Sequence, residues 1–156
     1  MVRSKISKID KYVLIIILLF FVLLSRLINR DFYSDEIYTL YHFVYTPLHN
    51  TIFEYQQGGG GLNNHFLFSV MMNLYVKLIH VDFTYLLNHP LIIRLPMVLF
   101  AIVTMYYINK LGGWVAVLLL CTTLPYYYYV TAVRGYSLSI MLIIMLFYYL
   151  QKGEVR

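Results

Sequence analysis

The sequence of 156 residues is poor in charge, since Asp, Glu, Lys and Arg make up 12% of it, about half the share that is usual in globular domains. So few charged side chains cannot cover a water-soluble fold, which excludes soluble enzymes and disordered tails. The chain has one cysteine, Cys121, which excludes a disulfide scaffold. No Gly-Lys-Ser/Thr follows the glycines at 58–61, which excludes a P-loop.

Hydrophobic residues make up 61% of the chain and are concentrated in four runs. About 20 apolar residues cross a bilayer, so the runs predict membrane spans at 12–28, 91–109, 112–130 and 135–151. A cleaved signal peptide is the rival interpretation of the first run, but residues 25–30 offer no small-residue cleavage site. The sequence therefore predicts an all-α integral membrane protein with a single domain, 1–156, and about four transmembrane helices.

The distribution of basic residues predicts the orientation in the membrane. Four spans place both termini on one side, where seven Lys and Arg residues fall against three to five on the other, since Arg26 and Arg94 lie at the boundaries. The seven are Arg3, Lys5, Lys8, Lys11, Lys110, Lys152 and Arg156, and the three are Arg30, Lys77 and Arg134. By the positive-inside rule, the N-terminus is cytoplasmic and residues 29–90 form an external loop of a multi-pass protein in the cell (inner) membrane. The basic residues form no face that fits nucleic acid.

This external loop contains two segments with a polar stripe at helical spacing. The stripes are Asp35, Thr39, His42 and Thr46 in the first segment, and His65, Ser69, Asn73 and Lys77 in the second. We expect interfacial amphipathic helices at 35–46 and 65–80, with their apolar sides in lipid or against the spans. The stripes would face water or each other and line a groove at the outer membrane surface.

Three short segments carry the candidate site residues. Asp35 and Glu36 follow Ser34, a suitable N-cap; they either favour the helix dipole or supply a general base at the water–lipid boundary. Asn64 and His65 either begin the second helix or line the same groove. The acids and histidines leave a divalent metal open, although no metal-binding motif is present.

The third segment contains Arg134 and Tyr136, immediately outside the fourth span. Arg134 either anchors to lipid head groups or binds a phosphate, because a guanidinium matches phosphate oxygens in a bidentate way. Arg94, at the outer end of the second span, has the same two interpretations.

The order of these motifs resembles the N-terminal portion of the GT-C membrane glycosyltransferases, and more narrowly glycosyltransferase family 39, the protein O-mannosyltransferases and the lipid A aminoarabinose transferases. An acidic pair follows the first span, a polar segment opens an interfacial helix, and basic motifs begin the second and fourth spans. These motifs are Asp35-Glu36, Asn63-Asn64-His65-Phe66, Arg94-Leu95-Pro96 and Arg134-Gly135-Tyr136-Ser137-Leu138, with Gly112-Gly113 between the second and third spans.

The resemblance implies transfer of a sugar from a polyprenyl-phosphate carrier to an acceptor hydroxyl on the external face. It implies that Asp35 is the catalytic base, with Glu36 beside it, and that Arg134 binds the leaving phosphate. His65, Asn64, Tyr136 and Arg94 would bind substrate. No cofactor is implied with certainty, and the partners would be the lipid-linked donor, membrane lipids and an acceptor glycan, lipid or protein. Because such transferases are several times longer, a truncated member is expected. The alternative is a small non-catalytic multi-span membrane protein or partner subunit.

Overall fold

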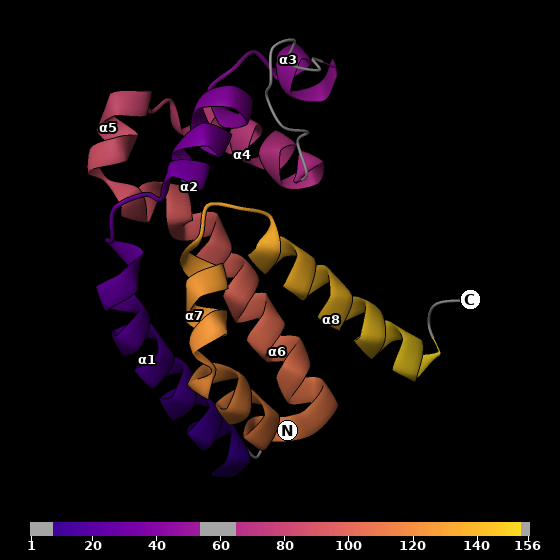
Figure 1. Cartoon of the computed structure of the whole chain (residues 1–156). Coiled ribbons are helices and arrows are strands. Elements are labelled where there is room, and N and C mark those ends of the chain that lie inside the picture. The colour runs from indigo at the N-terminus through magenta and orange to yellow at the C-terminus, as the bar shows by residue number, and fades with distance from the viewer. Residues whose placement is uncertain (1–7, 54–64, 154–156) are drawn as a thin grey trace, which may run out of the picture.

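The computed structural model describes residues 8–53 and 65–153, and the regular structure in these ranges is all helical. The elements are α1 (Lys8–Ile28), α2 (Ser34–Thr39), the π-helix η1 (Leu40–Val44), α3 (Leu48–Phe53), α4 (Phe66–Ile79), α5 (Phe83–Asn88), α6 (Pro90–Thr122), α7 (Leu124–Thr131) and α8 (Tyr136–Lys152). The long helices α1, α6 and α8 lie together with α7, and the short helices α2 to α5 cover one end of this bundle (Figure 1). The predicted all-α fold class is confirmed.

Helix α6 reverses its direction at Gly113. The backbone of Gly113 has φ 69° and ψ −172° inside an otherwise helical segment. The hydroxyl of Tyr126 lies 3.4 Å from the carbonyl oxygen of Ala101, 25 residues earlier, whereas a straight helix would separate them by about 37 Å. The chain therefore folds into a hairpin, and the glycines at the predicted junction between the second and third spans form its turn (Figure 1).

The predicted helix at 112–130 is wrong in one respect, because it is interrupted at Thr123. This residue has an extended backbone, with φ −85° and ψ 118°. Pro125 then lies in the first turn of α7, where a missing N–H costs no hydrogen bond. Helix α7 ends at Thr131, and the direction changes by 114° between α7 and α8.

Within the described residues, one helix, α6, is long and apolar enough to cross a membrane. Helices α7 and α8 pass the same test only as a pair, and they are sharply bent. One or two such helices are limited evidence for a membrane location, so the count of four spans stays a prediction.

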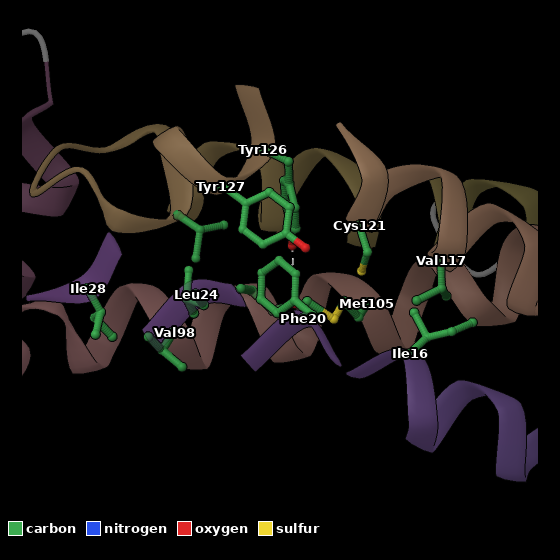
Figure 2. Packing of buried hydrophobic residues seen from close by; sticks show 12 residues of the cluster. Ile16, Phe20, Leu24, Ile28, Val98, Met105, Val117, Cys121, Tyr126 and Tyr127 are labelled. Atoms are coloured by element: carbon green, nitrogen blue, oxygen red, sulfur yellow. Dashed lines mark hydrogen bonds between the residues drawn. The ribbon is translucent and has the colours of Figure 1, made fainter. Parts of the chain in front are cut away.

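The bundle has an apolar core between α1, α6 and α7. Phe20 of α1 is stacked on Tyr127 of α7, with ring centroids 4.8 Å apart. Met105 and Cys121, from the two arms of the α6 hairpin, belong to the same cluster (Figure 2). The outward side of α1 is also apolar, with exposed side chains at Leu14, Ile15, Leu18, Leu19, Val22 and Leu23. A large exposed apolar surface is typical of a membrane or protein interface.

The helical cap at the other end agrees in part with the predicted interfacial helices. The predicted helix at 35–46 is α2 continued by η1, and the one at 65–80 is α4. The middle of the polar stripe of α4, at Ser69 and Asn73, is buried, whereas Lys77 at its end is exposed. Asn73 is buried, and its amide nitrogen donates to the carbonyl oxygens of Val44 at 2.9 Å and Thr46 at 2.8 Å. Helices α3 and α5 were not expected.

Candidate functional site

The beginning of α2 separates its two acidic residues. The N-cap is Tyr33, so the expected N-cap at Ser34 is wrong by one residue. A carboxylate oxygen of Glu36, at position N3, accepts a hydrogen bond from the backbone N–H of Tyr33, at 2.8 Å, which is the contact that the N3 residue of a capping box makes to its N-cap. Asp35 and Glu36 do lie in the first turn, as predicted, and they point to different surroundings.

Glu36 is buried, with 1% of its surface exposed. Its carboxylate lies 2.9 Å from the Arg30 guanidinium and 3.6 Å from that of Arg94. It also accepts a hydrogen bond from the backbone N–H of Val133, at 2.7 Å, across 97 positions of sequence. A buried carboxylate with this many partners is held in one place.

Arg94 belongs to the same buried network, with an exposed fraction of 0%. Its guanidinium donates to the carbonyl oxygens of Ile28, at 2.7 Å, and Arg30, at 2.6 Å. These carbonyl groups follow the last turn of α1 and would otherwise lack partners. The structure thus places Arg94 beneath the surface, where it joins the end of α1 to the start of α6.

Asp35 lies outside this network and pairs with Arg134. The carboxylate oxygen is 2.7 Å from a guanidinium nitrogen, and the two residues are 99 positions apart. The Asp35 side chain is 73% exposed and the Arg134 side chain 23% exposed. Two candidates from distant segments therefore meet at an open surface, where the α7–α8 connection passes the start of α2.

His65, the N-cap of α4, packs beside Tyr136, the first residue of α8, next to the α7–α8 connection. Their rings pack edge to face, with centroids 5.1 Å apart, and the Arg134 guanidinium carbon lies 5.9 Å from the centroid of the Tyr136 ring. A Cβ on Gly135 would come within 2.8 Å of Nδ1 of His65, so the close approach requires glycine. Burial, and then the charge of Arg134, lower the pKa of His65 below its usual 6.5. Asn64 lies outside the described residues.

A metal site gains no support in the described part of the chain. Among those residues no group of three or more His, Cys, Asp or Glu side chains is arranged to hold an ion. Asp35 and Arg134 neutralise each other, and Glu36 is occupied by its own partners.

The sequence did not reveal an apolar cleft between the end of α1 and α7. The cleft has a volume of about 350 Å³. It is lined by Leu27, Arg30, Tyr33, Leu124, Pro125, Tyr128, Tyr129 and Thr131. At this cleft the guanidinium of Arg30 lies over the ring of Tyr33, 4.2 Å from its centroid. The only feature of the sequence that pointed to this cleft was Arg30, a basic residue six positions before Glu36.

Comparison of the chain with protein-family models, with curated proteins and with solved structures finds no match.

Proposed function

We propose that this chain works in the transfer of a sugar from a polyprenyl-phosphate carrier to an acceptor hydroxyl at the outer surface of the cell membrane. The observation that carries the proposal is the pairing of Asp35 with Arg134, 2.7 Å apart at an exposed position on an apolar helical bundle. A carboxylate can accept the proton of the acceptor hydroxyl, and a guanidinium can bind the donor phosphate.

The membrane setting of the proposal comprises four spans and a cytoplasmic N-terminus. The apolar outer side of α1, the long helix α6 and the bent pair of α7 and α8 support it. The described acidic side chains, Asp31, Asp35, Glu36 and Asp82, belong to the segment between α1 and α6. The excess of Lys and Arg on the side of the termini agrees with the positive-inside rule.

In the proposed reaction, Asp35 accepts the proton of the acceptor hydroxyl while that oxygen attacks the anomeric carbon. The new bond joins the acceptor oxygen to the sugar, and the bond between the anomeric carbon and the phosphate oxygen breaks. The polyprenyl phosphate leaves with the electron pair, and the sugar inverts its configuration. Arg134 stabilises the negative charge that develops on the phosphate.

The pair of Asp35 and Arg134 must open for this reaction. A donor phosphate that binds the guanidinium competes with the carboxylate for it, and the carboxylate then becomes available as a base. The apolar cleft suits the prenyl chain of the donor, because it reaches Tyr33 and Thr131, which are close in sequence to Asp35 and Arg134. Glu36 and Arg94 act as positioning residues, since Glu36 holds the backbone of Val133 next to Arg134.

The test is sugar transfer by the full chain in liposomes, alone and together with any downstream sequence. The donors are polyprenyl-phosphate hexoses and pentoses labelled in the sugar, and release of polyprenyl phosphate is measured. The variant Asp35→Asn keeps the shape but loses the base, and it is expected to lower the rate by 10²-fold or more, on the order of what a general base contributes. The matched control Asp31→Asn removes a nearby exposed carboxylate and is expected to retain the rate. Equal rates for Asp35→Asn and the unmodified chain would contradict the assignment of the base.

A second candidate is a non-catalytic membrane protein that packs against partner helices. One observation favours it: α8 has an outward apolar face of exposed side chains, namely Leu142, Ile143, Leu146, Phe147 and Leu150. This candidate predicts that simultaneous replacement of Asp35, His65 and Arg134 by alanine leaves function intact, whereas polar substitutions on the α8 face abolish it.

A further inference from the structure

The end of the bundle far from Asp35 collects tyrosine and lysine side chains from two helices. Tyr106, Tyr107 and Lys110 lie at the end of the first arm of the α6 hairpin, just before the reversal at Gly113. Tyr148, Tyr149 and Lys152 form the last turns of α8. The hydroxyl oxygens of Tyr107 and Tyr149 are 3.1 Å apart, so the two helix ends meet. We name these six residues the tyrosine–lysine end.

The four rings form one continuous cluster. Tyr107 packs against Tyr106 and Tyr148 with centroid separations of 5.2 Å and 5.1 Å, and Tyr148 lies 5.3 Å from Tyr149. A lysine stands at each side of it. The ammonium of Lys110 is 5.3 Å from the centroid of Tyr106, and that of Lys152 is 4.8 Å from the centroid of Tyr148. Cation–π contacts of this length hold an ammonium group beside the ring.

We propose that the tyrosine–lysine end binds the phosphate head groups of anionic phospholipids. Tyrosine rings favour the level of the head groups, with the hydroxyl towards water and the ring towards the acyl chains. Two ammonium groups held at this level attract a negatively charged phosphodiester. The occupant is a lipid and not a soluble phosphate, because Leu146, Phe147 and Leu150 expose an apolar surface beside the tyrosines of α8 on which acyl chains can pack. This site is separate from the one that contains Asp35 and Arg134.

The only tryptophan of the chain, Trp114, provides the measurement. It follows Gly113 directly, four positions after Lys110, and is half-buried against the apolar core of the bundle. The full chain is reconstituted in vesicles of phosphatidylcholine that contain a small share of lipid brominated in its acyl chains. The brominated lipid is phosphatidylglycerol in one series and phosphatidylcholine in the other, and the quenching of Trp114 fluorescence is compared.

The unmodified chain is expected to favour phosphatidylglycerol by about fivefold for each lysine that contributes. In the double variant Lys110→Gln and Lys152→Gln this preference is expected to fall to near one. The control Lys77→Gln removes an exposed lysine of α4 and is expected to retain the preference. High salt is expected to reduce the preference of the unmodified chain, which tests the same point without any substitution.

Several outcomes would overturn the proposal. They are equal quenching by the two lipids, no quenching by either, a preference that survives in the double variant, or a preference that Lys77→Gln removes as well. Loss of the preference on addition of inorganic phosphate at constant ionic strength would show that the site binds a soluble phosphate and not a lipid. None of these results depends on sugar transfer, so the proposal stands or fails independently of the proposed activity.

Discussion

Two neighbouring acids have opposite surroundings at the residue scale. Glu36 has 1% of its surface exposed and binds two arginines and two backbone N–H groups, whereas the Asp35 side chain is 73% exposed and pairs with Arg134. Removal of one partner from a buried ion pair leaves an uncompensated charge, whereas exposed pairs contribute little to stability. Glu36 is therefore a structural group, whereas the exposed pair of Asp35 and Arg134 contributes little to the stability of the fold.

This difference predicts unequal effects of the matched variants Glu36→Gln and Asp35→Asn. Glu36→Gln is expected to lower the free energy of unfolding by about 3–5 kcal/mol, because Arg30 and Arg94 lose their counter-ion. Asp35→Asn is expected to lower it by about 0–1 kcal/mol. Denaturant unfolding in detergent micelles, followed by circular dichroism, measures both. Similar losses for the two variants would show that burial does not separate their roles.

His65 is expected to make the free energy of unfolding depend on pH. Burial and Arg134 lower its pKa in the folded state below 6.5, so the folded protein binds fewer protons than the unfolded chain in this window. Stability is then complete above about pH 6.5 and is lost as the pH falls through that value towards the lower pKa. The midpoint of unfolding, measured between neutral and mildly acidic pH, is expected to fall less steeply in His65→Gln than in the unmodified chain. A slope that the substitution leaves unchanged would assign the effect to another group.

At this scale the sequence predicted the contacts between surface side chains better than it predicted which side chains are buried. One interpretation of the sequence places His65 in the same groove as Asp35, and the resemblance implies that Arg134 and Tyr136 bind substrate. The structure brings Asp35 to Arg134 and His65 to Tyr136. The buried position of Arg94 could not be read from its neighbours, because it depends on unpaired carbonyl groups at the end of α1. The inward turn of Glu36 likewise depends on the N-cap at Tyr33.

The reversal within α6 is the decisive feature at the scale of elements. The backbone angles of Gly113, φ 69° and ψ −172°, belong to a region that is essentially restricted to glycine. A Cβ at this position would meet no atom within 4 Å, so the cost of a side chain comes from the backbone alone. The hairpin thus depends on conformation and not on a lack of space.

Gly113→Ala is expected to lower the free energy of unfolding by about 1–3 kcal/mol. The matched control is Gly153→Ala, which also has a φ of 69° but lies at the C-terminal end of α8, where fraying relieves the strain. Its effect is expected to be smaller. Thermal unfolding of both variants in the same detergent measures the difference, and a harmless Gly113→Ala would be evidence against this turn.

The predicted elements agree with the structure where the apolar pattern is long. Residues 12–28 lie within α1 and residues 65–80 correspond to α4, but the segment 112–130 is divided at Thr123. Helices α3 and α5 have six residues each, which is too short for a helical period to be recognised in the sequence.

At the scale of the whole molecule, the two ends of the bundle differ in charge: the acidic side chains that the structure describes lie at the cap end with Arg30, Arg94 and Arg134, and two lysines lie at the other end. Asp35 belongs to α2, in the helical cap, whereas Lys110 lies just before the reversal of α6 and Lys152 ends α8. Figure 1 shows the cap at one end of the bundle and the last turns of α8 away from it. We expect the cap to face outwards and the far end to face the cytoplasm.

This orientation predicts the labelling of single cysteines in intact cells. In a Cys121→Ala background, Lys77→Cys on α4 is expected to react with a membrane-impermeant maleimide, and Gln151→Cys on α8 is expected to react only after the cells are opened. Both positions are exposed in the structure. Labelling of both cysteines in intact cells would contradict the predicted topology.

The hydrogen bond from the backbone N–H of Val133 to Glu36 can form only after the chain has been synthesised as far as Val133. Arg30 and Arg94 leave the ribosome before Val133, which follows Arg94 by 39 residues, or about 2–8 s at 5–20 residues per second. During this interval the growing chain can neutralise Glu36 but cannot fix the segment that carries Arg134. The surface on which the proposed chemistry depends is consequently completed only after the α6 hairpin that precedes it has been synthesised.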